Sequence, residues 1–332
     1  MKNKEIPYVF HGPFKEYCIK YVAYKRSLGF KVNASSFYLL RGMDDFFKKY
    51  NLSSDALIMT KDMVEAYIAL RETENVKTQH MRMSLVRQFA LFMNRIGLKF
   101  YVYPVTDFVQ IKSDFVPYIF THDEVFRLID VLDKIQVSSR YPCYHIIYPM
   151  LFRMLYGCGL RINEALGLKM TDIDLKYGII MLNDTKNHSQ RLLPMSQSLQ
   201  RYCLYYTRRM EFPEAYEGYF YPSYYGGQYN STPVYCQFRK FMEQAGIFRE
   251  DGRTPRVHDV RHTFSVHALE KMVSEGRDIY CALPILSTYL GHKGIESTEK
   301  YLRLTEAAYT SLINSMTDIY EHIFPKVAED EK

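Results

Sequence analysis

The sequence contains no tryptophan, no C-x-x-C pair and no long apolar run. Its six cysteines are scattered along the chain, which argues against a zinc ribbon or a disulfide framework and predicts reduced, mostly structural thiols. Every apolar run falls short of the roughly 18 to 20 residues that a membrane span needs. Residues 1–10 carry two lysines but no apolar segment, so no secretory signal is predicted. We therefore expect a cytoplasmic protein with no membrane partner.

Positive charge is modest overall, but it is concentrated in the first third of the chain. The net charge is +6; residues 1–100 contain 17 Lys+Arg and 9 Asp+Glu, whereas the remainder contains 26 and 28. A basic first domain is typical of proteins with a polyanionic partner, although surface lysines also serve solubility alone. A length of 332 residues exceeds one ordinary core, so two domains are expected.

Residues 14–97 show apolar residues at helical spacing in four stretches. The predicted helices cover residues 14–28, about 35–49, the segment after the N-cap candidate Thr60, and 77–96. The fourth has a predicted apolar stripe of Met81, Leu85, Phe89, Phe92 and Met93. Its polar faces are predicted to carry Lys77, Arg82, Arg87 and Arg95. These four cations are candidate contacts to DNA phosphates, with a merely solvated face as the alternative.

The second half of the chain predicts a mostly helical domain with a small antiparallel sheet. Residues 105–119 form an extended linker between prolines, and Thr121 with Glu124 forms a capping box that opens the next helix. An almost entirely apolar helix over 144–156, expected to be buried on all sides, leads through a glycine turn to Arg161. Two strands over 179–182 and 191–194 are joined by a polar turn with Lys186 at its tip. Further helices are expected over 196–210, 234–245 and about 305–323, with a loop over 213–235.

Three basic side chains in this half could hold a phosphate. His258 and Arg261 are three residues apart on a predicted helix and therefore share a face. An arginine matches two phosphate oxygens, so convergence of Arg161 and Arg261 would create a clamp for phosphate charge. A tyrosine can serve as the covalent nucleophile, and a lysine such as Lys186 as the general acid for a leaving hydroxyl. Because the chain has 30 tyrosines, composition alone does not identify the nucleophile.

Five segments occur in the order of the signature motifs of one family. They are Leu160-Arg161-Ile162-Asn163-Glu164, Thr185-Lys186, the run from His258 to Phe264 (HDVRHTF), Leu290-Gly291-His292, and Tyr301 nine residues after His292. Over about residues 120–305 the chain resembles the tyrosine recombinase (phage integrase) family. The first domain looks like the helical core-binding domain of that family but has no motif of its own. The stretch from Lys271 to Ser287 is longer than the family pattern.

The resemblance implies a role for each motif residue. Tyr301 would be the nucleophile, and Arg161 and Arg261 would bind the scissile phosphate. Lys186 would protonate the leaving oxygen, and His258 would be the general base. His292 would donate a hydrogen bond in the transition state, and Glu164 would be a buried support for Arg161. The rival tyrosines are Tyr289 and Tyr309, whereas His262 and His267 read as core or supporting residues.

The resemblance also implies a reaction and an assembly. Strands would be cut and rejoined through a 3′-phosphotyrosine and a four-way junction, with neither metal, ATP nor other cofactor. The partners would be double-stranded DNA and further copies of the chain, which would form a homotetramer on two duplexes. A monomer is compatible with this reading for the protein free in solution. The expected domains are residues 1–104 (core-binding), 105–119 (linker), 120–304 (catalytic) and 305–332 (a C-terminal helix that docks on a neighbour or packs on its own domain).

Three other functions remain open from the residues alone. His258-Asp259-x-x-His262 imitates the H-E-x-x-H zinc motif, which would indicate a metallohydrolase. A DNA-binding accessory factor could keep the fold without activity. A type IB topoisomerase would share the phosphotyrosine chemistry but act alone and without preference for a site.

Overall fold

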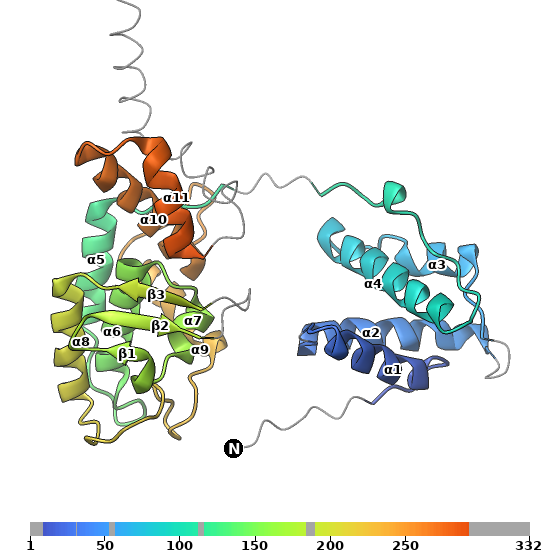
Figure 1. Cartoon of the computed structure of the whole chain (residues 1–332), viewed down its shortest axis with the longest axis horizontal. Coiled ribbons are helices and arrows are strands. Elements are labelled where there is room, and N and C mark those ends of the chain that lie inside the picture. The colour runs from blue at the N-terminus through green and yellow to red at the C-terminus, as the bar shows by residue number, and fades with distance from the viewer. Residues whose placement is uncertain (1–8, 31, 53–56, 112–115, 184–189, 292–332) are drawn as a thin grey trace, which may run out of the picture. The chain divides into compact units, whose positions relative to one another are not determined.

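The computed structural model describes residues 9–30, 32–52, 57–111, 116–183 and 190–291 (Figure 1). The chain divides into two compact units, residues 1–115 and 116–332, and the division falls inside the segment predicted as a linker. The described residues are mainly helical, with one small antiparallel sheet in the second unit. The fold class predicted from the sequence is therefore confirmed. In the described part of the chain, no helix has the length and apolarity needed to cross a membrane.

The first unit consists of four α-helices around an aromatic core. The helices are α1 (Lys15–Ser27), α2 (Ala34–Phe47), α3 (Lys61–Ile68) and α4 (Val76–Arg95), with short 3-10 turns at Lys48–Tyr50 and Val105–Asp107. The side chains of Asn33, Thr60 and Asn75 cap the starts of α2, α3 and α4, because each accepts a hydrogen bond from a first-turn N–H. All four predicted helices are present.

The buried face of α4 differs from the predicted one. Met81 is 46% exposed and Leu85 is only partly buried, whereas Met83, Val86 and Arg82 are buried. The prediction was wrong about Met81, at the start of the stripe, and about Arg82, which was expected on a polar face. The rest of the stripe, Phe89, Phe92 and Met93, is buried as predicted. The sequence pattern misled because it counts apolar residues, whereas the position of the helix here is also set by a buried cation.

Arg82 is buried because it donates hydrogen bonds to the backbone carbonyl groups at the end of α3. Its guanidinium donates to the carbonyl oxygens of Tyr67 and Ala69, and it pairs with the carboxylate of Glu74, which is itself almost fully covered. The last carbonyls of a helix have no partner within the helix, and a cation there also interacts favourably with the helix dipole. Arg82 is therefore a structural residue of the first unit and not a candidate DNA contact.

The second unit is built around a buried helix and carries the sheet. Its helices are α5 (His122–Asp133), α6 (Tyr144–Cys158), α7 (Ile162–Gly167), α8 (Gln197–Arg209), α9 (Ser231–Gln244), α10 (Val257–Ser274) and α11 (Ile279–Leu290), with a 3-10 turn at Met170–Asp172. The predicted capping box of Thr121 and Glu124 is present at the start of α5. Helix α6 is buried as predicted and packs against α5, α8 and α10 (Figure 1).

The sheet has the order β1-β2-β3 and is antiparallel throughout. The strands are β1 (Ile173–Asp174), β2 (Ile179–Leu182) and β3 (Arg191–Pro194), and Leu182 pairs with Arg191 at the end of the hairpin. Strands β2 and β3 match the prediction, and β1 is an additional short strand. The loop predicted over 213–235 ends earlier, since α9 begins at Ser231, and its Phe220 and Tyr221 are fully buried.

Two tight turns place the ends of α6 and α10. Gly159 ends α6 with a φ of +58°, and a Cβ there would collide with the ring of Phe264 on α10, so glycine is required on both counts. Helix α10 ends at Ser274, and after Gly276 (φ +83°) the side chain of Asp278 caps α11. The unusually long stretch from Lys271 to Ser287 is thus the end of one helix, a turn and most of the next.

Candidate active site

The first predicted motif lies at the start of α7. Arg161 is the N-cap residue, and its backbone N–H donates to Glu164 Oε2 at 2.9 Å while its guanidinium donates to Oε1 at 2.6 Å. The Arg161 side chain is 24% exposed and that of Glu164 only 6%. The glycine turn after α6 therefore delivers an arginine that is fixed by a buried carboxylate and still open to solvent.

Glu164 also binds two further arginines, one of which the sequence did not suggest. Arg191 of β3 donates to both carboxylate oxygens, at 3.3 and 2.9 Å, and the guanidinium of Arg261 on α10 lies 3.8 Å from Oε2. Arg161 and Arg261 are thus brought together around one carboxylate. One sequence feature could have singled out Arg191: it is the charged first residue of a predicted strand whose other residues are Leu, Leu and Pro.

The charge on Glu164 is maintained by its partners. Burial alone raises the pKa of this carboxyl, but the backbone N–H of Arg161 and the guanidinium groups of Arg191 and Arg161 outweigh it, so the pKa is lowered. Three guanidinium groups therefore surround one carboxylate, and the cluster has a surplus of positive charge. Such a cluster is suited to a phosphate, whose oxygens accept hydrogen bonds from arginine in pairs.

Arg261 is held by main-chain oxygens from two other segments. Its guanidinium donates to Gly159 O and Leu290 O, both at 2.6 Å, and the side chain is 2% exposed. These bonds join the ends of α6 and α11 to the second turn of α10. Loss of Arg261 would leave two buried carbonyl groups without this partner, so the residue is structural as well as basic.

Gly291 lies directly against Arg191. Its φ is +65°, and a Cβ on it would approach Arg191 Nη1 to 2.7 Å. The Leu290-Gly291 segment therefore packs on the arginine cluster, because Leu290 also accepts a hydrogen bond from Arg261. A glycine at this point of the motif permits both the left-handed turn and the close approach.

His258 is exposed on the first turn of α10, three residues before Arg261. Desolvation lowers the pKa of its imidazole, and the nearby positive charges of Arg261, Arg256 and Arg161 lower it further, against the opposing effect of Asp259. His258 thus lies within electrostatic reach of both predicted phosphate-binding arginines. A neutral imidazole near neutral pH is the form that can accept a proton.

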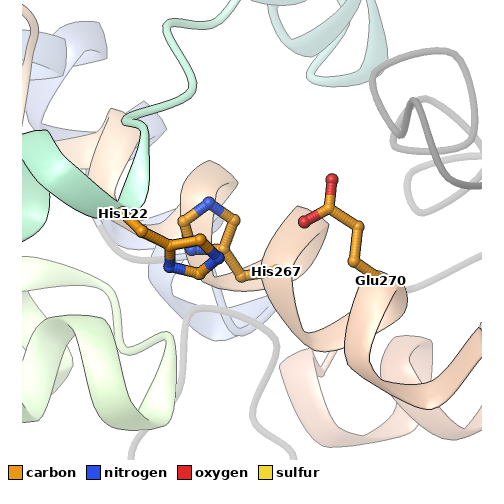
Figure 2. A group of neighbouring side chains, drawn as sticks. All are labelled: His122, His267 and Glu270. Atoms are coloured by element: carbon orange, nitrogen blue, oxygen red, sulfur yellow. The ribbon is translucent and has the colours of Figure 1, made fainter. Parts of the chain in front are cut away.

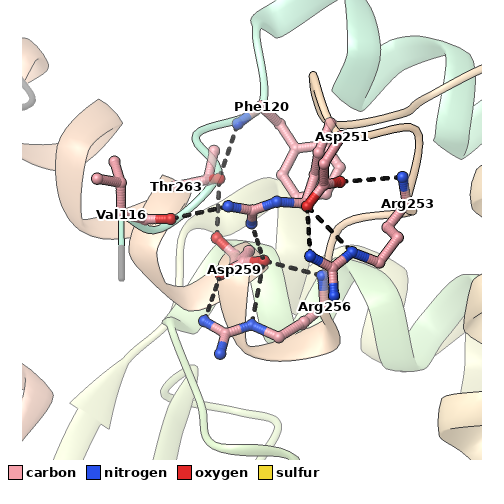
Figure 3. A network of polar contacts seen from close by, with 8 residues as sticks. Val116, Phe120, Asp251, Arg253, Arg256, Asp259 and Thr263 are labelled. Carbon is pink, nitrogen blue, oxygen red and sulfur yellow. Dashed lines mark hydrogen bonds and ion pairs between the residues drawn. The ribbon is translucent and has the colours of Figure 1, made fainter. Parts of the chain in front are cut away.

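Asp259 is fully buried, and the polar contacts drawn in Figure 3 anchor it at the beginning of α10. Its carboxylate accepts from the Arg256 backbone N–H at 2.8 Å and pairs with the Arg256 guanidinium at 3.0 Å and with that of Arg249 at 3.6 Å. Arg249 also donates to Val116 O, so the same group ties the first described residue of the second unit to the network.

The arrangement around Asp259 opposes the zinc-motif alternative for His258-Asp259-x-x-His262. In the described part of the chain, the Asp259 carboxylate is shared between two arginines, and the rings of His258 and His262 lie edge to face with centroids 4.9 Å apart. A dication between these histidines would face Arg256 and Arg261 instead of a free carboxylate. The arginine-rich surroundings favour an anionic ligand.

A basic groove adjoins His258. It has a volume of about 780 Å³ and is lined by parts of α9, the following loop and the start of α10. Arg239, Arg253, Arg256 and His258 contribute its basic side chains, and Glu243 is its one acidic lining residue. A groove of this charge, with His258 in its lining, could follow a polyanionic backbone.

Three predicted catalytic residues, Lys186, His292 and Tyr301, lie outside the described residues, as does Tyr309. The rival Tyr289 is described: burial raises the pKa of its phenol, its hydroxyl donates to Pro194 O at 3.3 Å, and its ring stacks on Phe264. A phenol that is harder to ionise is a poor nucleophile at neutral pH, so the structure disfavours Tyr289.

With Arg82 excluded, the three remaining candidate DNA contacts of the first unit lie in different environments. Lys77 is exposed. Arg87 donates to Tyr103 O at 2.6 Å and is half-buried, and Arg95 bonds the Tyr24 hydroxyl while lying over its ring. Lys77 and Arg95 therefore remain candidates, whereas Arg87 has a structural contact as well.

The family model described as the phage integrase family matches residues 119–308, more than half of the chain. The chain belongs to the phage integrase family. A putative integrase/recombinase, y4rB, of Sinorhizobium fredii is 26% identical over 296 residues, covering 87% of this chain and 92% of the relative. The tyrosine recombinase XerC of Oceanobacillus iheyensis is 27% identical over 274 residues, covering 79% and 82%.

Solved structures of similar fold include two complexes with DNA. The XerH site-specific recombinase bound to palindromic difH substrate, in a post-cleavage complex, has a TM-score of 0.61 at 16% identity, covering 86% of this chain and 80% of that one. The Tn1549 transposon integrase in complex with transposon right end DNA has a TM-score of 0.60 at 14% identity, covering 91% and 99%. At these identities the likeness concerns the fold.

Family membership favours recombination among the functions that the residues left open. The chain is a site-specific DNA recombinase of the tyrosine recombinase class, an enzyme that breaks and rejoins DNA, and DNA is its partner.

Proposed function

We propose that this recombinase exchanges strands between two specific DNA sites by transient attachment of a 3′ phosphate to Tyr301, without metal or ATP. The observation that carries the proposal is the convergence of Arg161 and Arg261, together with Arg191, on the carboxylate of Glu164, with His258 beside them. These groups come from α7, β3 and α10, which are far apart in the sequence. A cluster of fixed cations is what a phosphoryl transfer without a metal needs.

The proposed reaction begins with attack of the Tyr301 phenolate oxygen on the scissile phosphorus. The bond from phosphorus to the 5′ oxygen breaks, and Lys186 gives that oxygen a proton. Arg161 and Arg261 hold the non-bridging oxygens, His292 donates a hydrogen bond to them, and His258 accepts the phenol proton. Rejoining reverses these steps with the 5′ hydroxyl of the partner strand, so the bond energy is conserved in the phosphotyrosine.

We further propose that four copies act on two duplexes and pass through a four-way junction. The supporting feature is sequence-based: residues 305–323 carry an apolar stripe beyond the motif tyrosine. Such a stripe can dock in a groove of a neighbouring copy, and repetition of this contact closes a ring. The enzyme would act in the cytoplasm on the DNA held there.

The test is a suicide substrate that contains one target site with a nick near the cleavage position. The wild-type chain should become covalently joined to the 3′ phosphate, and the adduct should form in the presence of EDTA. Tyr301→Phe should eliminate the adduct, whereas Tyr309→Phe, the matched control, should keep it. Loss of the adduct in Tyr309→Phe but not in Tyr301→Phe would show that the nucleophile is Tyr309 and overturn the proposal.

Two further assays separate this function from its rivals. Recombination between two sites on one plasmid is expected, and relaxation of a plasmid without a site is not; the opposite result would indicate a topoisomerase. A chain that binds the site but never forms an adduct would be an accessory factor.

A further inference from the structure

A second cluster of potential ligands is formed by one residue of α5 and two of α10 (Figure 2). His267 and Glu270 are three residues apart and share a face of α10, and His122 is the first residue of α5. One ligand atom from each side chain lies within 4.8 Å of those from the other two. The imidazole rings of His122 and His267 are close, with centroids 4.1 Å apart and an interplanar angle of 32°.

The ring of His267 is held in place by a side chain of α6. Its Nδ1 shares a hydrogen bond of 2.9 Å with the hydroxyl of Tyr156, the kind of contact that orients a metal-binding imidazole.

The composition of the cluster selects a class of ion. Two imidazoles and one carboxylate suit Zn²⁺ and other borderline divalent transition metals, whereas Mg²⁺ and Ca²⁺ prefer oxygen ligands alone. Ligand bonds of about 2.0–2.2 Å at tetrahedral angles place the ligand atoms about 3.3–3.6 Å apart, so the three atoms, which now lie within 4.8 Å of one another, would have to move closer together. His122 is exposed and can make this adjustment by rotating its side chain.

We propose that His122, His267 and Glu270 form a binding site for Zn²⁺ or a similar divalent transition metal, which joins the first turn of α5 to α10. The site is separate from the catalytic cluster, because His267 follows His258 by nine residues, or about 13 Å along the helix. Its effect is structural: the bound ion reinforces a junction that the Phe120 N–H already makes with Thr263 Oγ1 at 3.0 Å. Three protein ligands leave a coordination position for water.

The test uses the full chain, stripped with EDTA and kept in a phosphine reductant so that its thiols stay reduced. Zn²⁺ is titrated in competition with a chelating chromophore, and thermal unfolding is followed with and without Zn²⁺. We expect one ion to bind per chain with an ion-dependent rise in Tm. Co²⁺ should give the absorption bands of a low-symmetry site with nitrogen and oxygen ligands.

Two ligand variants and one control locate the ion. His122→Ala and Glu270→Gln should each weaken Zn²⁺ binding by at least about tenfold and abolish the rise in Tm. His11→Ala removes an exposed histidine of the first unit and should change neither. If a ligand variant unfolds in EDTA at the same temperature as the wild type, its weaker Zn²⁺ binding is due to the missing ligand and not to a damaged fold.

Absence of Zn²⁺ binding by the wild type would overturn the proposal. So would unchanged binding by His122→Ala, since the ion would then occupy a different site, such as the thiols. None of these measurements depends on DNA cleavage, so their outcome is independent of the proposed strand exchange.

Discussion

At the scale of single residues, Glu164 organises the candidate active site. One carboxylate fixes Arg161, Arg191 and Arg261, which come from three different elements. The three groups differ in exposure: Arg161 is the most accessible, and Arg261 is almost fully covered. We infer that Arg161 is the group best placed to meet a substrate phosphate directly, whereas Arg191 positions the others.

The first prediction concerns Arg191. Arg191→Lys keeps the charge but loses the two-pronged contact with Glu164, so the orientation of the cluster should relax. We expect adduct formation on the suicide substrate to slow by about 10- to 100-fold, consistent with the loss of one charge-assisted hydrogen bond. Single-turnover rates and the Kd for the DNA site should be measured together, with Arg201→Lys on α8 as the exposed control. A Kd that weakens as much as the rate would contradict a positioning role.

The second prediction concerns the pH dependence of the reaction. Because the pKa of His258 is lowered, the neutral base should persist below the pH at which a free histidine is protonated, and the rate should fall only at more acidic pH. Arg256→Gln removes one of the nearby cations, so the acid limb of the rate profile should move to higher pH. Arg253→Gln, in the same groove, is the control. A limb that stays in place in Arg256→Gln would exclude His258 as the group that titrates.

At the scale of elements, the sequence predicted the helices and the hairpin but not all of their buried faces. Local signals such as the Thr121 capping box and the Gly157–Gly159 turn act within a few residues, and both were predicted correctly. Burial of Arg82 and the pairing of Arg191 with Glu164 depend on segments that meet only after folding. Apolar spacing contains no information about such charged partners, which is why the face of α4 and one member of the arginine cluster were missed.

A third prediction tests the role of Arg82 as a cap for α3. Arg82→Met should leave Glu74 and two carbonyl groups without their buried partner, and so lower the free energy of unfolding by about 3–5 kcal/mol. Arg95→Met, on the exposed end of α4, should change it by less than about 1 kcal/mol. Urea unfolding followed by circular dichroism measures both. Equal losses in the two variants would mean that the contacts of Arg82 contribute little.

At the scale of the whole molecule, function requires parts that the sequence places far apart. The surplus of basic residues in residues 1–100 is consistent with binding of this region to DNA phosphates. The motif residues, in contrast, lie in residues 161–301. The roles of Lys186, His292 and Tyr301 remain predictions from the motifs.

A fourth prediction separates assembly from chemistry. A chain that ends at residue 304 should still form the covalent adduct on a suicide substrate, because all the motif residues are present. It should fail to recombine two sites and to assemble a tetramer on DNA, as measured by native gel shift. Normal recombination by the truncated chain would contradict the docking of the predicted helix at 305–323 on a neighbouring copy.

The carboxylate at the centre of the arginine cluster also sets an electrical balance. Three guanidinium groups and one ionised carboxyl leave two unbalanced positive charges. A resting phosphodiester carries one negative charge, and the trigonal bipyramid formed on attack carries two. The charge of the cluster would thus be fully neutralised only by the pentacoordinate species, so the cluster would bind the transition state more strongly than the resting phosphodiester.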